Sequence, residues 1–204
     1  MHMGTNRLEA FSDGVIAVAI TLLILDIKVP SQDTPETLLH SLLIDWPHYA
    51  AYVVSFLTIG IIWINHHAMI GRLQQADHSI LILNLLLLMA IVLLPFTTEL
   101  MAAYLRASSG ESLAAGLYSG SLLLMSVLFS VLNRHILLAR AHMMRVELPL
   151  AERRRVLSRA VAGLIPYLIA TILAILSPYA TLAICGAVAV FYALPIASGG
   201  SQAA

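Results

Sequence analysis

Acidic, amide and imidazole side chains occur inside segments that are otherwise as apolar as lipid-facing helices. Asp13 opens one such segment, and a second contains Asn65, His66 and His67 in the stretch "WINHH". Asn84 lies near the start of a third. Side chains of these types donate and accept hydrogen bonds, transfer protons or ligate metals, and burying them without partners is costly. These residues are therefore the candidates for a functional or structural polar site.

Three kinds of chemistry fit these residues. A hydrogen-bonded knot would fix the first segment against the next two, and a proton relay would use Asp13 and the histidines. A metal site is disfavoured, because adjacent histidines on one helix diverge by about 100° and lack the i, i+3 or i, i+4 spacing of helical metal ligands. Without a nucleophile–base pair or a glycine-rich phosphate loop, the sequence predicts no enzyme, no metal and no cofactor.

The composition indicates the elements that must position this chemistry. Of 204 residues, 60% are hydrophobic and only 11% are charged, which is more apolar surface than a soluble domain of this length can bury. We therefore expect an all-α integral membrane protein. A membrane-spanning helix needs about 20 mostly apolar residues, and six segments qualify: 8–27, 47–70, 79–104, 112–138, 157–177 and 179–198.

The basic residues predict the orientation of these spans. Six spans place nine of the eleven Lys and Arg residues on one side and only Lys28 and Arg106 on the other. This asymmetry favours both termini in the cytoplasm. The same topology brings Ser12 and Asp13, "WINHH" and Asn84 to one depth near the cytoplasmic ends of the first three spans.

The first span begins with "RLEAFSDG". Arg7 and Asp13 are six positions apart, about 600° around a helix, so they do not share a face. Asp13 then needs a partner on another helix, and we expect His66 or His67, with Asn65, to supply it. Phe11 is four residues after Arg7 and is placed for a cation–π contact. The predicted structural network comprises Arg7, Phe11, Ser12, Asp13, Asn65, His66, His67 and Asn84.

The stretch Arg7–Gly14 resembles the Arg-x-x-x-Phe-Ser-Asp signature of the transmembrane protein 175 family, whose lysosomal members are potassium channels. The six spans, "WINHH" and a basic link between spans four and five agree with it, and the length is similar to the single-repeat prokaryotic branch. The resemblance implies a homotetrameric channel that favours potassium ions over sodium. It also implies a central pore lined by the first helix, with a constriction at Val18, Leu22 and Leu25 and a hydroxyl layer at Thr21.

Helical geometry is consistent with this constriction. Relative to Val18, Leu22 lies at about 40° and Leu25 at about 340°, and Thr21 flanks the stripe at about 300°. Rings of such side chains around a fourfold axis can gate by dewetting. Periodicity alone does not select this face, because the span is apolar all round. Asp26, one residue further on, would lie at the outer mouth of the pore.

Two alternatives stay open at this stage. A proton-coupled secondary transporter would use Asp13 and His66/His67, and a non-conducting membrane scaffold would use the basic segment 134–159. That segment is either a topology signal or a site for anionic lipid headgroups. We expect one six-helix channel domain at 7–199, disordered termini at 1–6 and 200–204, no nucleic-acid partner, and a multi-pass protein in a prokaryotic inner membrane.

Overall fold

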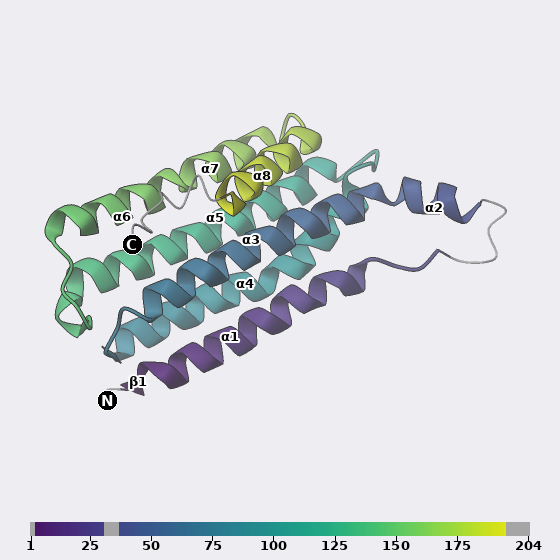
Figure 1. The fold of residues 1–204 in the computed structure, drawn as a ribbon. Helices are drawn as coiled ribbons and strands as arrows, with labels where there is room; N and C mark the ends of the chain where they lie inside the picture. Colours follow the sequence, from purple (N-terminus) through teal and green to yellow (C-terminus); the bar gives the residue numbers. More distant parts are fainter. Residues whose placement is uncertain (1–2, 31–36, 195–204) are drawn as a thin grey trace.

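The computed structural model describes residues 3–30 and 37–194, and within these ranges the chain is largely helical (Figure 1). The helices are α1 (Thr5–Leu22), α2 (Leu38–Ile44), α3 (Trp46–Ile70), α4 (His78–Tyr104), α5 (Glu111–Arg134), α6 (Leu150–Ala162), α7 (Leu164–Leu173) and α8 (Pro178–Ala193). Short elements join them: strands β1 (Met3–Gly4) and β2 (Gln75–Ala76), 3₁₀ turns η1 (Leu23–Asp26) and η3 (Ala141–Met143), and a π-helical turn η2 (His135–Ala139).

Local sequence explains where several helices begin. The Asp77 carboxylate accepts the Ile80 N–H at 2.9 Å and caps α4. The Ser177 hydroxyl accepts the Ala180 N–H at 3.2 Å, and Pro178 follows it in the first turn of α8. Gly110 precedes α5 with φ 85°, a left-handed conformation that glycine adopts without a Cβ clash.

In the described residues, five helical segments are long and apolar enough to cross a membrane: Thr5–Asp26, Trp46–Ile70, His78–Tyr104, Glu111–Ala139 and Leu150–Leu173. They correspond to the first five predicted spans. The sixth corresponds to α8, whose 16 residues measure about 24 Å, and the end of that prediction, 195–198, lies outside the described residues.

The fifth segment begins earlier than expected. We expected it to start at residue 157, whereas α6 begins at Leu150 and leads almost directly into α7. The division at Gly163 has a local cause, because Pro166 has no N–H to donate to the carbonyl of Ala162 four residues before it. The arginines at 153–155 therefore lie on a helix and not in a linker.

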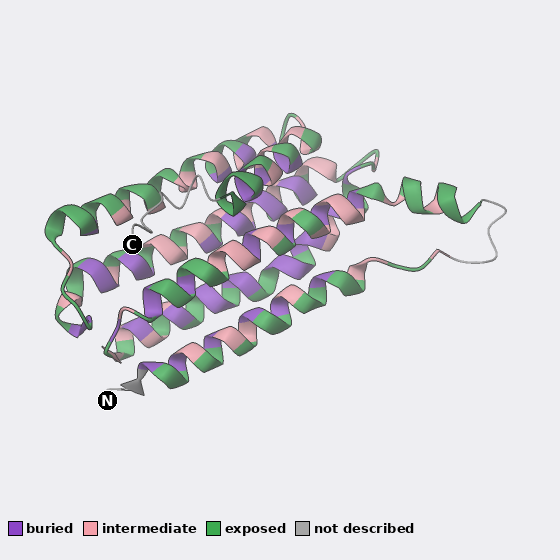
Figure 2. Ribbon diagram, viewed as in Figure 1, coloured by how far each residue is buried: buried purple, intermediate pink, exposed green. Residues whose placement is uncertain are grey.

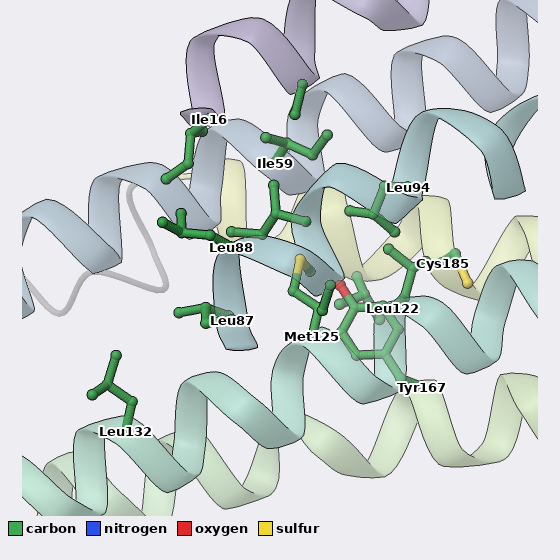
Figure 3. Close-up of a cluster of buried hydrophobic side chains, with 14 of the residues drawn as sticks. Ile16, Ile59, Leu87, Leu88, Leu94, Leu122, Met125, Leu132, Tyr167 and Cys185 are labelled. Atoms are coloured by element: carbon green, nitrogen blue, oxygen red, sulfur yellow. The ribbon is translucent and has the colours of Figure 1, made fainter. Parts of the chain in front are cut away.

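Helix α4 lies inside the bundle and packs against α1, α3 and α5, while α7 packs on α5 and α8 on α3 (Figure 1). Side chains from these helices form a single apolar core, part of which Figure 3 shows around Leu87, Leu122 and Tyr167. Helix α1 runs along the edge of the bundle and contributes only a narrow buried stripe (Figure 2).

Backbone pairing joins three segments at the end of the bundle where α1 begins. Strand β1 pairs antiparallel with β2 in the α3–α4 turn, so Met3–Gly4, which we had expected to be disordered, are ordered by this pairing. The same turn bonds to the α5–α6 link: the Gln74 N–H donates to the Met143 carbonyl and the Arg145 N–H to the Arg72 carbonyl, both at 2.8 Å. The start of α1 is thereby connected through one turn to the basic link.

Candidate functional site

Three side chains from three helices form a buried hydrogen-bonded chain. Ser12 of α1, His66 of α3 and Asn84 of α4 are all fully buried. His66 Nε2 lies 2.7 Å from Asn84 Oδ1, and Asn84 Nδ2 donates to Ser12 Oγ at 3.0 Å. Ser12 in turn donates to the Leu8 carbonyl at 2.9 Å. Because Asn84 Oδ1 can only accept, His66 must carry its proton on Nε2, and the chain runs in one direction from α3 to α1.

Asp13 has a different partner from the one predicted. Its Oδ1 accepts a hydrogen bond from the Trp63 indole Nε1 at 2.9 Å. The expectation that His66 or His67 would pair with Asp13 is therefore wrong, because His66 points inward to Asn84. Trp63 is the first residue of the same "WINHH" stretch, one turn before His67. The prediction therefore identified the correct helix but not the correct residue.

His67 pairs with Glu9, a residue that the sequence analysis missed. His67 Nδ1 lies 2.9 Å from Glu9 Oε1. Glu9 lies four residues before Asp13 on α1, and this i, i+4 spacing places both carboxylates on one face of the helix. That spacing is the signal in the sequence from which Glu9 could have been predicted.

Three residues that we predicted to belong to the network lie outside the hydrogen-bonded network that the structure shows. Phe11 is 53% exposed, Arg7 is exposed, and within the described residues neither forms an ion pair or a ring contact. Asn65 is also exposed and donates to the Ile61 carbonyl of its own helix at 2.8 Å. The 100° step between helical neighbours explains this result, since only one of three successive residues on α3 can face α4.

The predicted constriction residues lie on the exposed face of α1. Val18 is 58% exposed, Leu22 39% and Leu25 69%, and Thr21 is exposed with its hydroxyl bonded to the Ala17 and Val18 carbonyls at 2.9 Å. The helix tightens into the 3₁₀ turn η1 from Leu23 onward. Side chains three apart eclipse in a 3₁₀ helix, so Leu22 and Leu25 align more closely than an ideal α-helix would allow.

Asp26 does not share this exposure. Its Oδ2 is buried and has no hydrogen-bond partner among the described residues, and His48 and Lys28 are its basic neighbours. Nearby, His48 lies 2.6 Å from Asp45 and 3.5 Å from Glu99. A position of Asp26 at the outer mouth of a pore stays a prediction.

A groove of about 300 Å³ lies between α1 and α3 beside Asp13. Its walls are mostly apolar, and Trp63 and Gly60 line the α3 side. The Asp13 carboxylate is thus reached from outside the bundle, unlike the enclosed Ser12, His66 and Asn84.

Fold and site together define a multi-pass, all-α membrane protein whose first helix is held by a polar network and presents an apolar face outward. The family model described as the endosomal/lysosomal potassium channel TMEM175 matches residues 7–95. A potassium channel of Streptomyces collinus is 44% identical over 190 residues, 92% of this chain and 91% of the relative. A potassium channel of Chamaesiphon minutus is 39% identical over 197 residues, 93% and 94% of the two chains.

A solved structure indicates the same family. The crystal structure of a lysosomal potassium-selective channel TMEM175 homolog from Chamaesiphon minutus matches with a TM-score of 0.83 and 36% identity, covering 96% of this chain and 98% of that one. The chain belongs to the TMEM175 family, which confirms the resemblance found in "RLEAFSDG". This is a family of channels and not a class of enzymes.

Proposed function

We propose that the chain forms a homotetrameric, potassium-preferring cation channel with α1 of each subunit lining a central pore. The observation that carries this proposal is the exposed apolar stripe of Val18, Leu22 and Leu25 on a helix at the edge of the bundle. A second support is the relatives of similar length that are named potassium channels.

In this channel, rings of Val18, Leu22 and Leu25 constrict the pore, and Thr21 supplies a layer of hydroxyl groups beside them. A narrow apolar bore cannot replace the hydration shell of an ion, so it stops conduction until it widens. Valine is the smallest of the three side chains, and its ring leaves the widest opening of the three. Asp26 raises the local cation concentration near the outer mouth by its charge.

The polar network holds the pore helix in register. Ser12, Asn84 and His66 tie α1 to α4 and α3 through bonds of 2.7–3.0 Å. Asp13–Trp63 and Glu9–His67 add two further links between α1 and α3. We assign these residues to the mounting of the helix and not to ion selection, because the network lies on the face of α1 opposite the exposed stripe.

The protein is proposed to lie in a prokaryotic inner membrane with cytoplasmic termini. Nine of the eleven basic residues lie toward the end where α1 begins, which suits the positive-inside rule. On α6, Arg155 and Arg159 are exposed and lie about 27 and 21 Å from Leu173 along the consecutive helices α6 and α7. Long side chains at that depth reach the headgroups, so α6 is a candidate site for anionic lipid.

Flux in liposomes tests the channel. We expect reconstituted protein to pass potassium ions down their gradient, with a reversal potential under potassium/sodium bi-ionic conditions that favours potassium. Leu25→Asn should change conductance or selectivity because it places amides in the constriction. Leu168→Asn is the matched control, since Leu168 is 49% exposed on α7, on the far side of the bundle from α1.

The other readings have distinct outcomes in this assay. A proton-coupled transporter would show saturable flux that Asp13→Asn uncouples from pH while Leu25→Asn leaves it unchanged. A scaffold would pass no cation at all. Equal effects of Leu25→Asn and Leu168→Asn on conductance and selectivity would show that α1 does not line the pore.

A further inference from the structure

Three metal-ligating side chains converge at the start of α1, outside the proposed constriction. Glu9 and Asp13 project from one face of α1, and His67 projects from α3 opposite them. One ligand atom from each residue lies within 4.8 Å of the other two. We infer that Glu9, Asp13 and His67 form a binding site for a divalent transition-metal ion of the zinc, cobalt or nickel class.

The distances suit such an ion. Bonds from zinc to imidazole nitrogen or carboxylate oxygen are about 2.1 Å long, so two ligands on one ion lie about 3.0 Å apart at 90° and about 3.4 Å apart at the tetrahedral angle. His67 Nδ1 and Glu9 Oε1 already lie 2.9 Å apart. The three ligand atoms lie within 4.8 Å of one another, so the third must approach by at most about 1.4 Å for the tetrahedral angle or about 1.8 Å for 90°. Asp13 keeps one oxygen for Trp63 while the other turns toward the ion.

The donor set selects the class of ion. An imidazole with two carboxylates suits zinc, cobalt and nickel, whereas magnesium and calcium prefer oxygen donors alone. His66 takes no part, because it is fully buried against Asn84. The adjacent histidines thus diverge as the sequence indicated, and the residue that makes a site possible is Glu9.

The site is open to ions from water. His67 has 56% of its side chain exposed and Glu9 24%. Both lie within about one turn of the ends of their helices, roughly 5 Å, which is headgroup depth and not the apolar centre. Binding here does not depend on conduction, so this inference stands apart from the proposed channel function.

Trp63 is a reporter beside the site. Its indole bonds to Asp13 at 2.9 Å, and its ring centroid lies 6.1 Å from that of His67. The chain's other tryptophan, Trp46, begins α3 seventeen residues away, about 25 Å along the helix. In a Trp46→Phe background, the remaining indole emission comes from Trp63 alone.

The experiment titrates the tag-free Trp46→Phe protein in detergent with CoCl₂, a quenching ion, and separately with MgCl₂. We expect cobalt to quench Trp63 saturably, EDTA to reverse the quenching, and magnesium to have no effect. Glu9→Gln and His67→Asn should each raise the half-saturating concentration at least about tenfold, since even residues behind the ligands change metal affinity by 10–100-fold. Calorimetry with ZnCl₂ on the unmodified chain should give one ion per subunit.

His142→Asn is the matched control, because it removes an exposed imidazole from the α5–α6 link and should leave the titration unchanged. Size-exclusion profiles verify that each variant is folded, and Glu9→Gln is close in shape to the native side chain. Quenching that does not saturate, or that is equal in all variants, would be collisional and would overturn the site. A tenfold loss of cobalt affinity in His142→Asn alone would place the ion elsewhere.

Discussion

Replacing Asn84 with alanine removes the residue that connects α3 to α1. The change deletes the bonds to His66 (2.7 Å) and Ser12 (3.0 Å) and leaves the buried His66 Nε2–H without an acceptor. Interhelical hydrogen bonds in membranes are worth about 0.6–1.7 kcal/mol each, so two of them suggest a loss of about 1–3 kcal/mol. At roughly 2–4 °C per kcal/mol for a chain of this size, the midpoint of thermal unfolding should fall by roughly 2–12 °C.

Thermal melting followed by fluorescence-detected size exclusion measures this loss. Asn65→Ala is the matched control, because it removes the same side chain from the same depth, but Asn65 donates to the Ile61 carbonyl of its own helix. Its midpoint should change by about 1 °C or less. Ser12→Ala combined with Asn84→Ala should destabilise less than the sum of the single changes, because both remove the same bond. Equal shifts for Asn84→Ala and Asn65→Ala, or strict additivity, would refute the directional chain.

Two further predictions concern the ends of the helices. Burial of Asp77 opposes its ionisation, but the Ile80 N–H and Arg140 outweigh this effect and hold the pKa of Asp77 below the ordinary aspartate value. The ionised carboxylate therefore stabilises the fold above about pH 4. This stabilisation is lost as the pH falls through the lowered pKa. The difference in melting midpoint between wild type and Asp77→Asn should accordingly shrink from pH 6 to pH 3, and a constant difference would contradict this. Gly110→Ala forces a Cβ to within 3.1 Å of the Tyr104 ring at φ 85° and should cost about 1–2 kcal/mol, measured as a lower melting midpoint. Gly120→Ala within α5 meets nothing within 4 Å and should cost nothing. Equal midpoints for the two variants would contradict backbone strain at Gly110.

Much of the fold could be predicted from local properties of the chain. The first five spans follow from runs of apolar residues, since the bilayer sets the length of a crossing helix. The start of the fifth span was predicted wrongly because an arginine-rich stretch is typical of a solvated linker, whereas here the stretch is helical from Leu150. Ordering of Met3–Gly4 was missed as well, because pairing with Gln75–Ala76 depends on a turn seventy residues away.

The sequence by itself determined that polar groups from α1, α3 and α4 meet at one depth, because span length and direction fix the height of every residue. Only the tertiary structure decided which of them pair. The rotation of each helix about its axis directs His66 to Asn84 and His67 to Glu9. It also places Asp13 within hydrogen-bond distance of Trp63. That rotation is set by packing against neighbouring helices, and a span that is apolar on every face carries no periodic signal from which to read it.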